Sequence, residues 1–322
     1  MDTRTTPLGM HHVSSLSADA VKNHDFYTRV MGLRLVKKSV NQDDPGMYHL
    51  FYADARGTPG TDMTFFEMPN AARWKMGNHS ISRVGMRVAG ADTLDYWMDR
   101  LNDHGIFTHG VATRDGRLVL DFEDPEGHPV SLIDDGGRGQ SHPWKLSPVP
   151  AEHQIRGLGY DILTVPKLGP TEKFLTEALN MERVRGYQNP EAPDTEVHVY
   201  QMGEGGADAE IHVAVRRDLE PMRYGAGGVH HLALRIPDEE AQKFWIDRLN
   251  SKGFRNSGPV DRYYFKSIYV REPNGILFEL ATDGPGFDVD EDSDALGEKL
   301  ALPPFLETHR SEIESHLHPI GV

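Results

Sequence analysis

Two pairs of adjacent histidines and one glutamate carry side chains that could bind a metal ion. The pairs are His11-His12 and His230-His231, and each opens a short apolar stretch, HHVSSLS and HHLALRI. Glu279 lies in the apolar stretch LFELA, where a carboxylate is costly unless it is paired or metal-bound. Neighbouring residues of a strand point to opposite faces, so one imidazole of each pair would face the concave side of its sheet. Two neutral imidazoles and one carboxylate suit Fe(II) and leave coordination positions open for a substrate and O2.

The composition limits which metals and partners suit the chain. It has no cysteines, which excludes disulfides, zinc–cysteine sites, iron–sulfur clusters and cysteine nucleophiles. With 17 histidines and 49 acidic residues, a metal site must be built from imidazole and carboxylate, which suit Fe(II), Mn(II), Ni(II), Zn(II) and Co(II). The formal net charge of −15 disfavours nucleic acid and anionic membrane surfaces as partners.

The remaining composition predicts a soluble globular protein. Apolar residues make up 38% of the 322 residues and charged residues 26%, which is enough apolar material for a full core. The first residues, MDTRTTPLGM, lack the apolar run of a signal peptide, and no stretch reaches the length of a membrane span. We therefore expect a cytoplasmic protein with no membrane partner. The subunit number stays open, and a homo-oligomer is compatible with the sequence.

A repeat at a fixed offset of 148 residues organises the chain. The sequence WMDRLN begins at Trp97, and WIDRLN begins 148 residues later at Trp245. A glycine follows each of them, at Gly105 and Gly253, and further on DPEG matches EPNG at the same offset. One offset held over about 45 residues without a gap indicates a duplication into two halves.

Each half is expected to contain two similar modules, which begin near residues 12, 83, 158 and 231. The last module is the clearest, with a strand at Leu232–Ile236, a helix at Glu239–Lys252, and strands at Tyr263–Val270 and Ile276–Ala281. The third module shows fewer strands. We therefore predict an α+β fold of four tandem βαβββ modules, in two pseudo-repeated halves, whose curved mixed sheets surround a metal site. The expected divisions are residues 1–140 with modules 1 and 2, residues 141–285 with modules 3 and 4, and an acidic linker and C-terminal segment at 286–322.

The repeat also supplies an internal comparison for the metal site. At the offset of 148, the positions of His12, His231 and Glu279 correspond to Tyr160, Arg83 and Ser131. That second set of side chains binds a divalent metal poorly. We therefore expect one metal ion per chain.

Some other residues are weaker candidates for this site. Glu67 ends the first module, in the stretch TFFE, much as Glu279 ends the fourth. It is a candidate fourth ligand, and an edge or exposed carboxylate is the alternative. His49, His198 and His212 lie in expected strands and are weak candidates for a place beside the ligands. The histidines expected in solvent are His24, His104, His109, His142, His309, His316 and His318.

At these residues the chain resembles a known family. The module pattern resembles the vicinal-oxygen-chelate superfamily, which includes glyoxalase I, extradiol dioxygenases and bleomycin-resistance proteins. More narrowly, the chain is similar to ring-cleaving dioxygenases of the chlorohydroquinone dioxygenase type. The similar stretches are LGMHHVSSLS, FYTRVMGLRLVKKSVNQDDPGMYHLFYAD, GTPGTDMTFFEMP, GVHHLALRI and LPPFLETHRSEIESHL. The resemblance spans nearly the whole chain, and its specific part is the two HH pairs with the closing glutamate.

The resemblance implies a role for each residue of the pairs. The second histidine of each pair, His12 and His231, would bind the metal together with Glu279. The first histidine of each pair, His11 and His230, would lie beside these ligands. A nearby histidine can take the proton of an aromatic diol, which binds Fe(II) best as an anion.

Three further residues match the family's pattern. Ser14 stands where the family can have a threonine near the metal, and it keeps the hydroxyl but loses a methyl group. Arg262 and Tyr269 match an arginine and a tyrosine that the family places beside the substrate. Arg262 would stabilise developing negative charge, and Tyr269 would donate a hydrogen bond to a bound oxygen. A surface salt bridge and an ordinary strand aromatic are the alternatives for these two residues.

The resemblance implies a non-haem, Fe(II)-dependent ring-cleaving dioxygenase, an oxidoreductase that uses O2 on a hydroquinone- or catechol-like aromatic diol. Mn(II) accepts the same ligands. A glyoxalase-like isomerase or lyase is a second hypothesis, favoured if Glu67 joined the site as a fourth ligand. A metal-free small-molecule binding or resistance protein is a third, and stoichiometric metal would count against it.

Overall fold

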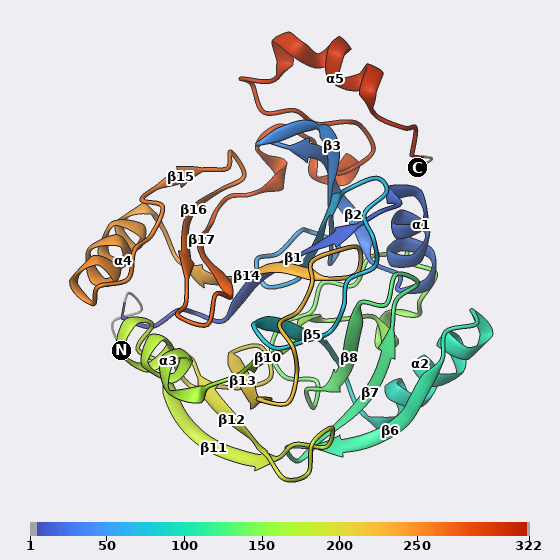
Figure 1. The fold of residues 1–322 in the computed structure, drawn as a ribbon. Coiled ribbons are helices and arrows are strands. Elements are labelled where there is room, and N and C mark those ends of the chain that lie inside the picture. The colour runs from blue at the N-terminus through green and yellow to red at the C-terminus, as the bar shows by residue number, and fades with distance from the viewer. Residues whose placement is uncertain (1–4, 321–322) are drawn as a thin grey trace.

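The strands of the computed structural model, which describes residues 5–320, form two curved sheets (Figure 1). The first sheet has eight strands in the order β15-β16-β17-β14-β1-β4-β3-β2. Their bounds are β1 Met10–Ser17, β2 Arg34–Asn41, β3 Asp44–Ala53, β4 Asp62–Glu67, β14 Val229–Ile236, β15 Val260–Asp261, β16 Phe265–Arg271 and β17 Leu277–Pro285.

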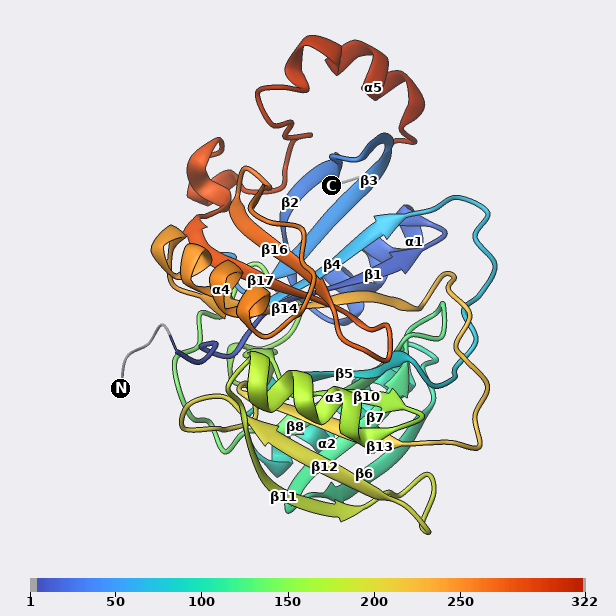
Figure 2. The same ribbon diagram turned by 60° about the vertical axis from the view of Figure 1, so that its left-hand side comes forward.

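The second sheet has nine strands, in the order β11-β12-β13-β10-β5-β8-β7-β6 with β9 beside β5. Figure 2 shows this sheet below the first one, so that the two sheets form two stacked layers of the molecule. Its strands are β5 Ser80–Val88, β6 Thr108–Arg114, β7 Arg117–Glu123, β8 Pro129–Asp134, β9 Gly157–Leu158, β10 Asp161–Val165, β11 Glu182–Gln188, β12 Glu196–Gln201 and β13 Glu210–Val215.

One helical segment follows the opening strand of every module. The first and third are short and continue into a π-helical turn, and the second and fourth are regular helices of 13 residues. The segments are α1 Ala20–Asp25 with η1 Phe26–Val30, α2 Ala91–Asp103, α3 Leu168–Lys173 with η3 Phe174–Ala178, and α4 Glu239–Ser251. Near the C-terminus lie α5 Arg310–His316 and the 3₁₀ turns η4 Phe287–Val289, η5 Ser293–Ala295 and η6 Glu307–His309, while η2 Ala151–His153 precedes module 3.

The predicted α+β fold of four βαβββ modules is confirmed. Each module supplies one helical segment and strands to the sheets, and module 3 contains the strands β11–β13 that its sequence showed less clearly. The two sheets do not follow the two halves of the chain. One sheet joins module 1 to module 4, and the other joins module 2 to module 3.

The 148-residue repeat is visible in the packing. Trp97 of α2 and Trp245 of α4 are both fully buried, and the helices end before Gly105 and Gly253, whose φ angles are +73° and +78°. Glycine is favoured there because other residues adopt this left-handed conformation at a cost. The two π-helical turns also lie 148 residues apart. The duplication therefore extends to the earlier parts of the halves, where the sequences agree less.

The pairing of β1 with β14 determines where a metal site can form. These strands run antiparallel, and Ser14 lies opposite His231. Strand β17 pairs with the other edge of β14, so that Ala233 lies opposite Glu279. Both histidine pairs and the glutamate thus lie on three neighbouring strands, although 267 residues separate His12 from Glu279 in the sequence.

The C-terminal segment packs on the outer strands of the first sheet, as Figure 2 shows. The fully buried Lys37 of β2 forms ion pairs with Asp290, at 2.7 Å, and with Glu291. Leu302 and Ile313 pack on Val40. Among residues 5–320, no helix is both long and apolar enough to cross a membrane.

Candidate metal centre and its pocket

His12, His231 and Glu279 meet on the concave face of the first sheet. Nε2 of His231 lies 2.9 Å from Oε2 of Glu279, and Nε2 of His12 lies 3.3 Å from the same oxygen. The two Nε2 atoms are 3.3 Å apart. All three side chains are buried. One ligand atom from each residue lies within 4.8 Å of the others, which is a spacing that one metal ion can bridge.

The hydrogen bonds of His11 determine which nitrogen of His12 carries a proton. Nε2 of His11 lies 3.1 Å from the carbonyl oxygen of Thr282, which can only accept, so this nitrogen is the donor. Burial lowers the pKa of His11 to about 3, so its ring is neutral and its Nδ1 is an acceptor. That Nδ1 lies 2.9 Å from Nδ1 of His12, which must therefore be the donor. With its proton on Nδ1, His12 can present the lone pair of Nε2, as a metal ligand requires.

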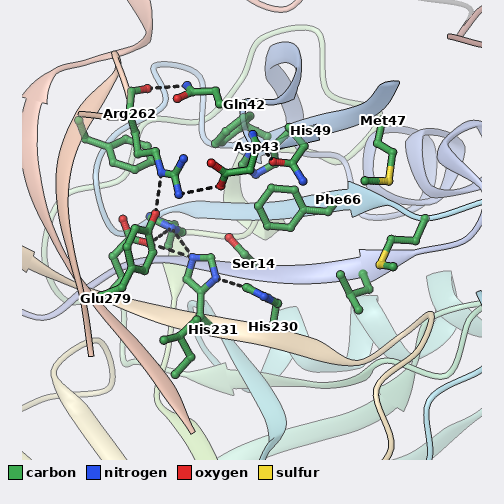
Figure 3. A pocket seen from close by; sticks show the side chains of 18 of the residues that line it. Ser14, Gln42, Asp43, Met47, His49, Phe66, His230, His231, Arg262 and Glu279 are labelled. Carbon is green, nitrogen blue, oxygen red and sulfur yellow. Dashed lines mark hydrogen bonds and ion pairs between the residues drawn. The ribbon is translucent and has the colours of Figure 1, made fainter. Parts of the chain in front are cut away.

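The second histidine pair repeats this contact. Nδ1 of His230 lies 2.7 Å from Nδ1 of His231 (Figure 3). Burial lowers the pKa of His230 to about 4 and also lowers the pKa of His231. Both rings are therefore neutral near pH 7, and one proton is shared between the two Nδ1 atoms.

Ser267 orients the carboxylate of Glu279. Its hydroxyl donates a short hydrogen bond from the neighbouring strand β16 to Oε1 of Glu279. Oε2 is buried, faces the two imidazoles and accepts no hydrogen bond within residues 5–320. Burial acts to raise the pKa of Glu279, but attraction to His12 and His231 in their proton-bearing forms outweighs it and lowers this pKa well below its usual range. The carboxylate is thus ionised and presents one oxygen to the site.

These atoms fit a divalent metal ion. Three electron-rich atoms converge in a buried space, and no side-chain proton separates the bare Nε2 of His12 from the ionised Oε2 of Glu279. Such an arrangement is costly unless a cation lies among the atoms. Imidazole and carboxylate without thiolate suit a metal of the iron and manganese type.

A pocket of about 540 Å³ opens beside these three side chains. Figure 3 shows Ser14, His49, Phe66 and Arg262 around it. The wall is mixed, with polar groups near the ligands and a set of apolar side chains. The apolar lining consists of Leu16, Met47, Phe51, Phe66, Met68, Tyr224, Tyr264, Phe265, Tyr269 and Leu277.

Arg262 and Tyr269 form a pair in this pocket. Nε of Arg262 donates to Oη of Tyr269 at 3.0 Å, and a terminal nitrogen of Arg262 forms an ion pair with Asp43 at 3.0 Å. The amide of Gln42 donates to the carbonyl oxygen of Arg262 at 2.9 Å. Burial raises the pKa of Tyr269, so its hydroxyl keeps its proton. Because Oη already accepts from Arg262, that proton is available to a molecule in the pocket.

Ser14 is part of a chain of hydrogen bonds that the sequence did not reveal. Its hydroxyl lies 2.7 Å from Oγ1 of Thr64, which in turn lies 3.1 Å from Nε2 of His49. The His49 ring lies between Phe51 and Phe66, with ring centroids 4.0 Å from each. Burial lowers the pKa of His49 well below its ordinary value, so the neutral ring is its resting form.

Among the residues expected at the site, His11, His12, Ser14, His230, His231, Arg262, Tyr269 and Glu279 come together. His11 is the one of these that does not line the pocket. Ser267, Asp43 and Gln42 were missed. Ser267 gave only a weak signal, as a small polar residue in the stretch FKSIYV, and its role depends on the register of β16 against β17.

Glu67 lies outside the metal group. Side chains alternate along β4, so Phe66 faces the pocket and Glu67 points to the opposite face. Its carboxylate accepts a hydrogen bond from the backbone N–H of Ala20, at the start of α1. The position of Glu67 therefore does not supply a fourth carboxylate ligand.

The equivalent part of the second sheet contains two arginines, Arg83 and Arg114. Arg83 lies 3.2 Å from Glu191 and 3.7 Å from Asp121, and Arg114 donates to the hydroxyl of Ser131 at 3.1 Å. The cavity there measures about 20 Å³, room for about one water molecule. Guanidinium groups thus occupy the space that the first sheet leaves open.

A second group of possible ligands lies nearby in this sheet, at Asp115, Glu210 and His212. Arg185 donates to both carboxylates, and Arg117 lies 2.9 Å from Glu210. Burial acts to raise the pKa of Glu210, but His212 and the two arginines lower it. These acids already have cationic partners, in contrast to Glu279.

Comparison with known proteins agrees with this geometry. The family model described as the Glyoxalase/Bleomycin resistance protein/Dioxygenase superfamily matches residues 9–132 and 157–280, two segments offset by 148 residues. A Bacillus subtilis (strain 168) protein with the provisional name ring-cleaving dioxygenase MhqA is 51% identical, over 97% of this chain and 98% of its own. The chlorohydroquinone/hydroquinone 1,2-dioxygenase of Sphingobium indicum is 32% identical, over 95% and 94% of the two chains.

A solved structure shows the same fold over the whole length. It is the crystal structure of a provisionally named dioxygenase from Bacillus subtilis subsp. subtilis str. 168, with a TM-score of 0.91, 33% identity and 99% of each chain covered. The chain belongs to the glyoxalase/bleomycin resistance protein/dioxygenase superfamily.

Proposed function

We propose that this protein is an Fe(II)-dependent ring-cleaving dioxygenase that acts on a hydroquinone- or catechol-like aromatic diol with O2. The observation that carries the proposal is the group of His12, His231 and Glu279, which offers three ligand atoms beside an open pocket. Relatives that cover nearly the whole chain carry the names of ring-cleaving dioxygenases, which supports this activity over others of the superfamily.

The three protein ligands leave coordination positions free for small molecules. When bound there, Fe(II) would supply a path for electrons between an aromatic diol and O2. Mn(II) is accepted by the same ligands. His11 and Ser267 orient two of the proposed ligands. His11 fixes the proton on Nδ1 of His12, and Ser267 fixes the rotation of the Glu279 carboxylate.

His230 acts as a hydrogen-bond donor in this proposal. For His231 to present a bare Nε2, its proton must lie on Nδ1, which then donates to Nδ1 of His230. The neutral His230 ring consequently carries its proton on Nε2. This ring lines the pocket, where its N–H can hold an oxygen of the diol. This differs from the proton-accepting role that the family resemblance suggests for a neighbouring histidine.

Ser14 offers a route for the proton that the diol releases. Its hydroxyl faces the pocket and forms a hydrogen bond with Thr64, which forms another with His49. Protons can shift along such a chain because each hydroxyl both donates and accepts. We assign Ser14 the first step of this transfer and His49 the last.

Tyr269 and Arg262 stabilise negative charge. The Tyr269 hydroxyl accepts from Arg262 and has its own proton free to donate. The guanidinium lies 5.2 Å from the centre of the tyrosine ring and strengthens that donor. Donors held in place before the reaction lower the barrier most where charge develops.

Oxygen uptake after anaerobic loading with Fe(II) tests the proposal. The loaded protein should consume O2 with hydroquinones or catechols and give a ring-opened product. Glu279→Gln, which keeps the size of the side chain and removes its charge, should lose both the metal and the uptake. The proposal fails if no aromatic diol supports oxygen uptake by fully loaded protein.

A further inference from the structure

The pocket beside the metal ligands is much larger than an aromatic diol. Its volume is about 540 Å³, whereas an apolar cavity of about 150 Å³ is enough to bind benzene. Pockets of about 300–1,000 Å³ hold molecules of drug size. A diol bound at the ligands would therefore leave most of this space free.

The free space has an apolar wall. Leu16, Met47, Phe66 and Met68 line it and form what we call the methionine sub-pocket. Figure 3 shows Met47 and Phe66 across the pocket from Glu279. The charged pair Arg262–Asp43 belongs to the side near the ligands. A substituent directed away from the metal would thus meet carbon and sulfur atoms.

The mouth of the pocket continues this apolar surface. Met68 is 40% exposed and Tyr224 is 49% exposed, and both line the pocket. They lie on the two segments that join the sheets, which pair with each other through Lys75 and Arg223. Large apolar side chains held partly exposed at a pocket mouth are typical of a binding surface. Methionine is flexible and polarisable, so it adapts to apolar groups of different shapes.

We propose that the substrate is an aromatic diol with an apolar alkyl substituent of several carbons, which lies in the methionine sub-pocket and points toward Tyr224. This inference rests on the proposed ring-cleaving function and narrows its substrate class. Halide or methyl groups would fill only a small part of the free volume. Each methylene buried there should raise kcat/KM about fourfold, from the free energy of transferring it out of water.

A series of hydroquinones tests this inference. Oxygen uptake by Fe(II)-loaded protein is measured with hydroquinone and its methyl, propyl and pentyl derivatives. The expected result is a kcat/KM that rises with every added carbon until the chain reaches the mouth. Met68→Trp fills part of the methionine sub-pocket and should reduce the ratio of kcat/KM for pentylhydroquinone to that for hydroquinone. Met76→Trp is the matched control, because Met76 is 46% exposed on the same segment and does not line the pocket. It should keep the wild-type ratio.

Two results would overturn the inference, and they can be told apart. If hydroquinone is cleaved but longer chains bring no gain, or Met68→Trp keeps the wild-type ratio, the substituent does not bind in the methionine sub-pocket and the proposed function still stands. If no compound of the series supports oxygen uptake, the proposed function fails and the inference fails with it.

Discussion

The Nδ1 atoms of His11 and His12 lie 2.9 Å apart, and the proton between them belongs to His12. The assignment follows from Thr282, whose carbonyl oxygen lies 3.1 Å from Nε2 of His11 and takes the only proton of that neutral ring. The two adjacent histidines of β1 thus have different roles. His12 presents a lone pair to the metal site, and His11 holds it in the correct tautomer.

Replacement of His11 should weaken metal binding without removing a ligand. His11→Phe removes the acceptor for the His12 proton, so metal affinity should fall by about 10- to 100-fold. His11→Asn keeps an oxygen near the position of Nδ1 and should lose less. Competition with a chromophoric chelator measures both variants. Equal affinities in wild type and His11→Phe would show that His11 does not orient His12.

Ser267→Ala should destabilise the carboxylate side of the site. The variant leaves Oε1 of Glu279 buried without its donor, which typically costs about 1–3 kcal/mol of unfolding free energy. Metal affinity should fall as well. Ser15→Ala is the matched control, since Ser15 is equally buried and its hydroxyl has no partner within residues 5–320. Chemical denaturation of both variants in metal-free buffer makes the comparison, and equal losses would contradict the role of Ser267.

Tyr269→Phe should slow catalysis and leave metal content unchanged. The substitution removes one hydroxyl that accepts from Arg262 and donates into the pocket. Loss of a donor at a developing charge typically lowers kcat by about 10²- to 10³-fold. Steady-state oxygen uptake with metal analysis separates the two effects. A change in KM alone would instead indicate that Tyr269 contributes to substrate binding only.

Arg262→Lys tests whether geometry or charge matters in this pair. Lysine keeps the positive charge but cannot donate in the fixed directions that reach both Tyr269 and Asp43. We expect a kcat between those of wild type and Arg262→Ala. Full activity in Arg262→Lys would show that only the positive charge of Arg262 matters, and not its hydrogen-bond geometry.

His128 should make the fold sensitive to acid. This residue lies in the turn between β7 and β8 and is fully buried, its Nδ1 donates to the carbonyl of Gly227, and burial lowers its pKa to about 4. The unfolded chain takes up this proton near pH 6.5, whereas the folded chain resists it. The contribution of the neutral His128 to the free energy of unfolding is therefore complete above pH 6.5. It decreases as the pH falls, and about 3 kcal/mol of this free energy is lost at pH 4. His128→Asn retains a donor and should show a flatter pH dependence in urea unfolding. Parallel curves for the two proteins would contradict this assignment.

The sequence predicted the fold well because the duplication is regular. The helix expected at Glu239–Lys252 is observed at Glu239–Ser251, and the module starts agree within a few residues. The pairing of module 1 with module 4, which brings the candidate ligands together, comes from the β1–β14 ladder. Strand order depends on contacts between distant segments, which local sequence patterns do not contain.

The sequence indicated the three proposed ligands but not the contacts that support them. His12, His231 and Glu279 had a signal, because each places an ionisable group in an apolar strand. Ser267 and the chain from Ser14 through Thr64 to His49 had almost none. Their roles come from the registers of β16 with β17, of β1 with β4 and of β3 with β4. Glu67 had the same sequence signal as Glu279 and lies on the opposite face of its strand.

Metal stoichiometry tests the central claim most directly. The protein is loaded with Fe(II) under anaerobic conditions and desalted. Its metal content per chain is then measured by inductively coupled plasma mass spectrometry. The account predicts one metal ion per chain in wild type and none above background in Glu279→Ala, with retention in Glu67→Ala, which removes a buried carboxylate outside the metal group. Undiminished metal in Glu279→Ala, or two ions per chain in wild type, would contradict it.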